Sequence, residues 1–134
     1  MKRTLLLPAL LALGFGICVV AQTEADYSGW MKDVAATKGK VGKAVAAKQN
    51  EEVATGATHL AGLFKQVGAF FTGRNMSDAA SIAQSAASAS SDLAAAAKAG
   101  DDAKIASSMQ EVNAACGTCH AAHRGGTAGS YTIK

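Results

Sequence analysis

The chain has one proline, at position 8, and none in the rest of its 134 residues. Proline interrupts helices because it lacks an N–H donor and clashes with the preceding turn. Its absence therefore allows long, unbroken helices. Alanine, the strongest helix former, is abundant, and the alternation of apolar and polar residues that marks half-buried strands is missing. Together these features predict an all-α fold.

Apolar residues recur at intervals of three and four in four stretches of similar length, which predicts four amphipathic helices. The predicted helices are Asp26–Gln49, Glu51–Thr72, Asp78–Ala99 and Asp102–Arg124. The third has only a thin stripe of small residues, which would let a neighbour approach closely but also fits a flexible linker. Four helices joined by short loops pack most simply as an antiparallel bundle.

The ends of these helices carry their own signals. Three residues suited to N-capping stand before them, each followed by acidic residues that complement the helix dipole: Asn50, Ser77 and Asp101. Glycines suited to stopping a helix follow them: Gly73, Gly100 and the pair Gly125-Gly126. The sequence thus predicts a four-helix domain over residues 22–124 and a flexible C-terminal tail over 125–134.

Residues 1–21 have the pattern of a secretory signal peptide. Lys2 and Arg3 form the positively charged N-terminal region, and Leu5–Val20 forms the apolar region. Cleavage is predicted after Ala21, because signal peptidases cut after small residues. The apolar run is short and holds one proline and two glycines, which disfavours a membrane anchor. A lipid anchor on Cys18 is disfavoured too, because a bulky isoleucine precedes it.

Removal of this leader would change the charge and the cysteine content of the chain. It takes Lys2 and Arg3 from the 13 basic residues, which leaves eleven against ten acidic ones. That balance gives no support for nucleic-acid binding. Cleavage also removes Cys18, so Cys116 and Cys119 would be the cysteines of the mature chain. Export predicts that these two thiols meet an oxidising compartment, the bacterial periplasm.

The fourth predicted helix carries Cys116-Gly117-Thr118-Cys119-His120, a C-x-x-C-H motif. In c-type haem attachment the two thiols add across the vinyl groups of haem, and the adjacent His binds the iron. Two cysteines three residues apart lie on one side of a helical turn, where they match one edge of the porphyrin. The motif therefore predicts one covalently attached haem c, with its iron bound by His120.

Two other chemistries use similar residues. A redox-active C-x-x-C pair belongs at a junction between strand and helix, and no strand is predicted before Cys116. A zinc site could draw on Cys116, Cys119, His123 and a distant His59, but structural zinc sites usually have two well-spaced ligand pairs. Both alternatives are less favoured than haem.

The run from Cys116 to His120, with Arg124 four positions later, resembles the class II c-type cytochromes, the group of cytochrome c-prime and its low-spin relatives. The four-helix pattern extends the resemblance over nearly the whole mature chain. It implies a left-handed bundle with haem near one end, crossed by the first helix on the distal side. Arg124 would pair with a haem propionate or border the proximal pocket. His123 departs from the family, which usually has an aromatic residue, most often Phe, at this position.

The ligand opposite His120 decides what such a haem does. In the low-spin relatives an axial Met lies in a Met-Lys-Asp-like context near the start of the first helix, and Met31-Lys32-Asp33 looks like that. Met31 is therefore the expected second iron ligand. The alternatives are Met31 packed over an open iron, Met76 in a loop, or His59. Met109 shares a helix with His120 and cannot reach the opposite face.

Two functions follow from these alternatives. A six-coordinate haem with His and Met ligands predicts a periplasmic carrier of single electrons, whereas an open iron predicts a protein that binds nitric oxide or carbon monoxide. No catalytic acid, base or nucleophile stands out, so an enzyme is not expected. Expected partners are redox proteins and, as the family often shows, a second copy of the chain. Lysines gather on the first helix and could guide docking or form a solvated face: Lys32, Lys38, Lys40, Lys43 and Lys48.

Overall fold

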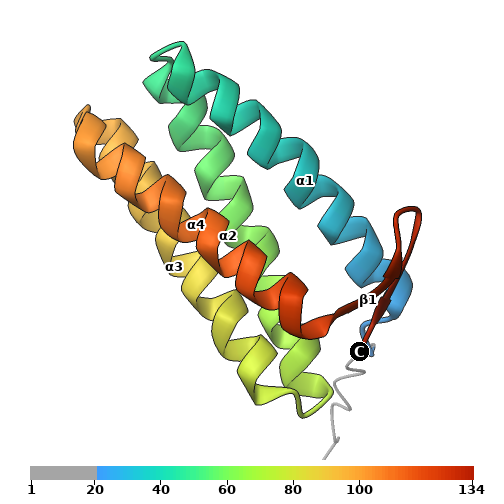
Figure 1. Ribbon diagram of the computed structural model, residues 1–134. Helices are drawn as coiled ribbons and strands as arrows, with labels where there is room; N and C mark the ends of the chain where they lie inside the picture. Colours follow the sequence, from blue (N-terminus) through green and yellow to red (C-terminus); the bar gives the residue numbers. More distant parts are fainter. Residues whose placement is uncertain (1–20) are drawn as a thin grey trace, which may run out of the picture.

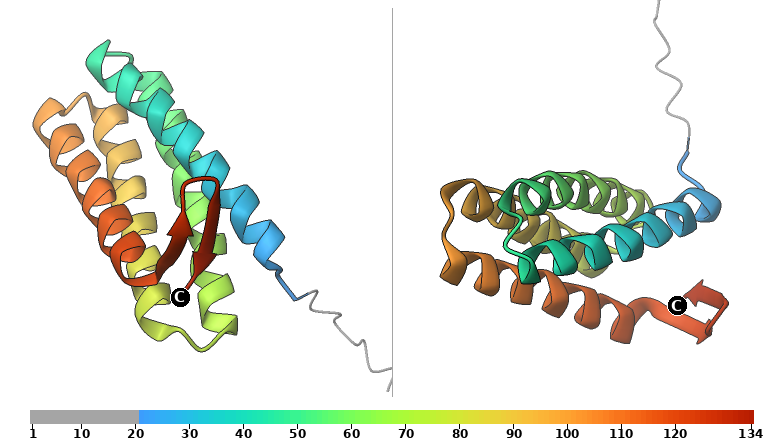
Figure 2. Two further views of the ribbon diagram at one scale, coloured as in Figure 1. Left: turned by 45° about the vertical axis from the view of Figure 1, so that its right-hand side comes forward. Right: turned by 90° about the horizontal axis from the view of Figure 1, so that it is seen from above.

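The computed structural model describes residues 21–134, which form four helices and a terminal hairpin (Figure 1). The helices are α1 (Glu24–Ala46), α2 (Asn50–Gly73), α3 (Ser77–Ala99) and α4 (Asp102–His123). Successive helices run in alternating directions and pack as a bundle (Figure 2). This confirms the predicted all-α, four-helix architecture, and the third segment is a helix rather than a linker. The predicted leader, apart from Ala21, lies outside the described residues.

The three turns between helices share one hydrogen-bond pattern, in which a residue in the left-handed conformation ends each helix. That residue is Lys48 after α1, Asn75 after α2 and Gly100 after α3, with φ of 58°, 58° and 68°. After α1, the N–H groups of Lys48 and Gln49 donate to the carbonyls of Val45 and Ala44. The helix therefore ends at Ala46, three residues before the predicted end at Gln49.

The N-terminal caps agree with the sequence in part. Asp101 caps α4 by accepting a 3.0 Å hydrogen bond from the N–H of Lys104, as predicted. Asn50 and Ser77 are the first helical residues rather than N-caps, so α2 and α3 each begin one residue earlier than predicted, and neither helix has a side-chain cap. A capping box that was not predicted begins α1: Thr23 and Asp26 satisfy each other's backbone N–H groups.

Buried side chains form two adjoining apolar clusters along the bundle. The longer cluster draws on all four helices and contains Val41, Leu60 and Leu93, none more than 1% exposed. The shorter one is aromatic, with Phe70 and Phe71 of α2 against small residues of α3. The alanine stripe of α3 is buried throughout, so this helix packs closely on both α2 and α4.

The first and last helices approach each other less closely than the helices that are consecutive in sequence. Close backbone packing joins α1 to α2, α2 to α3 and α3 to α4. Figure 2 shows the N-terminal half of α1 and the C-terminal half of α4 diverging toward the end that carries the C-x-x-C-H motif. The side chain of Lys38 spans the two helices with a 3.0 Å hydrogen bond to Asn113.

Gly56 of α2 is required where α1 crosses it. A Cβ atom on Gly56 would overlap Cγ2 of Val41, which is 1% exposed, whereas one on Gly62 would meet nothing within 4 Å. We expect Gly56→Ala to lower the free energy of unfolding by about 1–3 kcal/mol through overpacking. Gly62→Ala, the matched control, should raise it by up to about 1 kcal/mol, because alanine favours helix. Urea denaturation measures both, and equal effects would contradict the tight crossing.

Residues 124–133 form an antiparallel hairpin, which corrects the expectation of a loose tail after residue 124. Strand β1 (Arg124–Thr127) pairs with β2 (Ser130–Ile133). Gly126 and Gly129 have φ of 76° and 86°, a conformation that favours glycine, so they shape the turn rather than simply stopping a helix. Ile133 packs against the aromatic cluster and thereby anchors the hairpin to the bundle.

Within the described residues, no helix has the length and apolar character needed to cross a bilayer.

Candidate haem-attachment site

The C-x-x-C-H motif occupies the last two turns of α4. Cys116 and Cys119 lie three residues apart on the helix, both are partly buried, and both are free thiols. Cys116 packs against the longer apolar cluster. Burial is the main cause that raises the pKa of both thiols, so they are neutral at pH 7. Two unpaired thiols on one side of a helix have the spacing that a haem edge requires.

His120 follows the second thiol and is partly buried as well. Burial lowers the pKa of its imidazole, and the positive charges of Arg124 and Lys38 lower it further. The imidazole is therefore neutral at pH 7, which is the form that binds a metal ion. Lys38 of α1 donates a hydrogen bond to Asn113, which stands seven residues before His120 and therefore on the same side of α4, so this side is turned toward α1.

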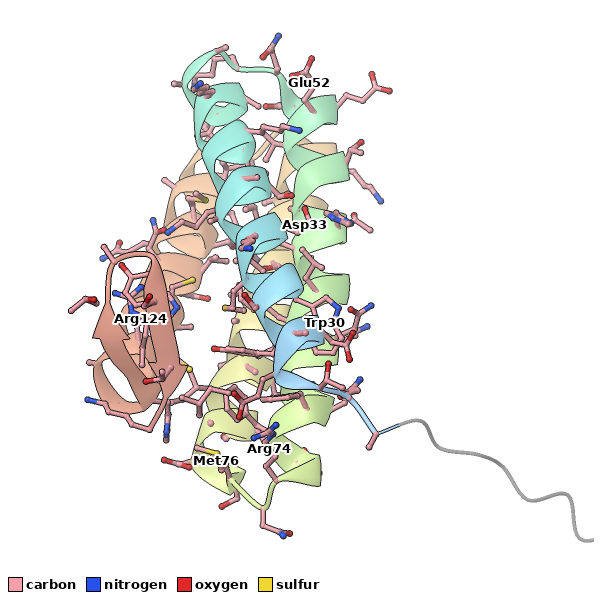
Figure 3. The ribbon with its side chains drawn as sticks, turned by 90° about the vertical axis from the view of Figure 1, so that its right-hand side faces the viewer. Trp30, Asp33, Glu52, Arg74, Met76 and Arg124 are labelled. Carbon is pink, nitrogen blue, oxygen red and sulfur yellow. The ribbon has the colours of Figure 1, made fainter. Side chains whose placement is uncertain are left out.

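Met31 lies on the part of α1 that faces the interior. It is partly buried and packs against both apolar clusters, as does its neighbour Trp30. In Figure 3, Trp30 and Asp33 project from α1 toward α2. The Trp30 ring meets Phe70 of α2 edge to face, with ring centroids 6.4 Å apart. Met31 thus belongs to the apolar surface between α1 and the rest of the bundle, where the resemblance expects the distal side of a haem.

An aromatic wall closes this end of the bundle. Tyr27 stacks on Phe70 at 5.0 Å and meets Phe71 edge to face at 5.4 Å. Burial raises the pKa of Tyr27 to about 12, with a smaller contribution from Cys119 and an opposing one from Arg124. Tyr27 therefore lies within electrostatic reach of the second thiol of the motif.

Arg124 stands at the start of the hairpin, directly after α4. Its guanidinium carbon lies 4.4 Å from the centre of the Tyr131 ring, a cation–π contact on the outer side of β2. In Figure 3, Arg124 lies on the hairpin at about the level of Trp30, between the levels of Asp33 and Arg74 along the bundle. The positive charge of Arg124 acts on both His120 and Tyr27, so this residue borders the candidate site.

The other ligand candidates lie elsewhere. His59 places Nε2 2.9 Å from Oδ2 of Asp33, an exposed pair that joins α2 to α1. Met76 immediately precedes α3 and packs against the aromatic cluster, while Met109 packs against the longer one from within α4. In the part of the chain that the structure describes, no three His, Cys, Asp or Glu side chains converge on one point. The zinc set that included His59 is therefore not brought together.

The donor set fits haem c on three observations from the described residues. The thiols are unpaired and share one side of a helix. The adjacent imidazole is kept neutral by its surroundings. The neighbouring helix offers a thioether and aromatic rings, which would exclude water from a porphyrin. A comparison with known protein families, curated proteins and solved structures finds no match, so this assignment depends on the chain's own residues.

Proposed function

We propose that this chain is a periplasmic monohaem c-type cytochrome, related to class II, that carries single electrons between redox proteins. The observation that carries the proposal is the C-x-x-C-H turn near the C-terminal end of α4, with two free, partly buried thiols and a neutral imidazole. Haem c would supply the one-electron chemistry when bound. The chain's residues would attach it, ligate it and keep water away.

Each residue of the site has a distinct part in this proposal. Cys116 and Cys119 would fix one edge of the porphyrin to α4, and His120 would donate its free nitrogen lone pair to the iron. Tyr27, stacked on Phe70, would cover the apolar ring close to Cys119. Arg124 would balance a propionate, since its charge already acts on His120. A buried, preorganised surrounding of this kind lowers the cost of changing the iron's charge.

Met31 is the proposed second ligand, because it is a partly buried sulfur on the interior side of α1. We expect Met31→Ala to convert the ferric haem from low to high spin and to lower its reduction potential, because a thioether ligand raises that potential. Optical and electron paramagnetic resonance spectra measure the spin state. Met109→Ala is the matched control and should leave the spectrum unchanged.

The same spectra test the alternative of a gas-binding protein. A low-spin spectrum that carbon monoxide barely alters would support electron transfer with Met31 as ligand. A high-spin spectrum that shifts promptly with the gas, and that Met31→Ala leaves as it was, would replace electron transfer with binding of nitric oxide or carbon monoxide. A colourless protein, purified from cells that attach haem c, would overturn both.

Docking of an acidic redox partner would use the lysines of α1 that have no role in holding the bundle. Lys38 is bonded to Asn113 and Lys48 to Asp102, whereas Lys32, Lys40 and Lys43 are exposed. Complementary charge mainly accelerates association and loses its effect in salt.

A further inference from the structure

His123, the last residue of α4, is a titratable group that the proposed electron transfer does not yet use. Its side chain is 11% exposed, although histidine could reach solvent at a helix end. Nε2 lies 2.9 Å from Oδ2 of Asp78, but the buried nitrogen is not in line for a hydrogen bond. A neutral imidazole here leaves a buried nitrogen poorly satisfied, whereas a protonated one gains a carboxylate partner.

The surroundings of His123 favour such a change of charge. On α2 it faces the uncharged ring of Phe71, whose centroid is 6.2 Å away. On α3 it faces Asp78, in the first turn of the helix. The pKa of Asp78 is lowered mainly by the backbone N–H of Ala79 and further by the charge of His123, so the carboxylate is ionised at pH 7. Asp78 also acts on the pKa of Cys119, which places the pair beside the proposed haem attachment.

The remaining charged groups near His123 come from the other elements that meet at this end. Tyr27 of α1 stays neutral until about pH 12. Arg124 of β1 follows His123 directly and is directed over the Tyr131 ring. The backbone N–H of Lys134 donates a 3.0 Å hydrogen bond to the carbonyl of His123. This bond ties the end of the hairpin to the backbone of His123. Asp78 is the group at ion-pair distance.

His123 and His120 have different neighbours. The pKa of His120 responds to burial, Arg124 and Lys38, on the side toward α1. His123 instead lies against α2 and α3, one helical turn beyond His120. A proton on His123 would therefore act on a haem through space without competing for the iron.

We propose that His123, paired with Asp78, takes up a proton when the haem of this chain accepts an electron. The inference rests on the proposed function. In the step, a one-electron donor protein reduces ferric to ferrous iron, and one proton from water binds the imidazole nitrogen of His123. No covalent bond to carbon forms or breaks. The proton partly offsets the positive charge that the iron loses at this end of the bundle.

The first test is the reduction potential of the haem-loaded protein between about pH 5 and 8, the range in which imidazoles titrate. Reduction removes one positive charge from the iron and should therefore strengthen proton binding at His123, and a roughly tenfold strengthening is the effect to be tested. For a one-electron couple this corresponds to about 59 mV. The potential should therefore fall by about that amount as the pH rises through this range.

Three variants separate His123 from other titrating groups, including the haem propionates. His123→Phe, which keeps an aromatic ring beside Phe71, should abolish most of the fall of the reduction potential with rising pH. Asp78→Asn should shift the fall of the reduction potential to lower pH, because the imidazolium loses its carboxylate partner. The Asp78 side chain is 69% exposed, so this variant should fold. His59→Gln is the matched control: its pair with Asp33 has the same 2.9 Å separation but is about half exposed. This variant should leave the fall unchanged.

A second readout follows the proton itself. The imidazole resonances of His123, assigned by comparison with His123→Phe, should titrate at higher pH in the reduced than in the oxidised protein. Equal titration in both states, or a fall in potential that persists in His123→Phe, would overturn the proposal. These outcomes are distinct from failure of the proposed function, which would appear as a protein without covalent haem or as an iron that exchanges no electrons.

Discussion

The double variant Cys116→Ser/Cys119→Ser will accumulate without covalent haem. Serine keeps the size and the helical position of each residue, but its hydroxyl does not add to the vinyl groups as a thiol does. Both cysteines are partly buried within the last two turns of α4, and burial raises their pKa, so serine should disturb the fold little. Staining for haem after denaturing electrophoresis, together with the intact mass, measures the attachment.

Thr118→Ala is the control for this experiment. Thr118 lies between the two cysteines and is exposed, so its removal changes the motif without removing a sulfur. We expect this variant to keep its haem through electrophoresis. Haem that stays attached in the double-serine variant would show that the thiols are not the attachment points. The covalent cytochrome assignment would then be wrong.

Phe71→Ala will produce the largest loss of stability among single substitutions in the aromatic cluster. Phe71 is fully buried and contacts Tyr27, Phe70 and His123. Truncation of a buried phenylalanine typically costs about 3–5 kcal/mol, through lost apolar burial and the cavity left behind. Guanidinium denaturation followed by circular dichroism should show a lower midpoint with an unchanged slope.

The control for Phe71 is Ser88→Ala, at an exposed position of α3. Substitutions at such surface positions usually change the free energy of unfolding by less than about 0.5 kcal/mol. A loss at Phe71 of similar size to the control would mean that the aromatic cluster does not hold this end of the bundle. The aromatic surroundings argued for the candidate haem would then lose their structural basis.

The helices were predictable because their signals are local. Periodicity identified all four, and Asp101 and Gly100 have the cap roles expected from their chemistry. The C-terminal ends of α1 and α2 were misplaced because a residue other than glycine takes the left-handed position there. Lys48 and Asn75 adopt positive φ because the backbone hydrogen bonds that end α1 and α2 compensate for the strain.

The hairpin was missed because its stability is largely tertiary. The stretch has little apolar alternation, and its strands are held by the contact of Ile133 with the aromatic cluster and by Arg124 over Tyr131. The sequence did contain one signal for a hairpin. Gly129 precedes a run of strand-forming residues, Tyr131 to Ile133, and β-hairpin turns often contain glycine.

In the candidate site, too, features set by local sequence could be predicted, whereas features set by contacts between helices could not. The C-x-x-C-H run and the Met31-Lys32-Asp33 run are visible from order along the chain alone. The partners of the histidines are not, because each belongs to another helix. His59 finds Asp33 from α1, and His123 finds Asp78 from α3. Spacing within one helix carries no information on which residue of a neighbouring helix lies opposite.

The loose seam between α1 and α4 has a consequence for the order in which the chain assembles. Every other close helix pair is consecutive in sequence, so those contacts close short loops and form quickly. Contact between α1 and α4 joins distant parts of the chain; the bond from Lys38 to Asn113 spans 75 residues. Closing so long a loop costs more entropy. We therefore expect the contact between α1 and α4 to form after the other helix contacts. The turn with Cys116 and Cys119 is then expected to stay accessible during folding until the first helix docks.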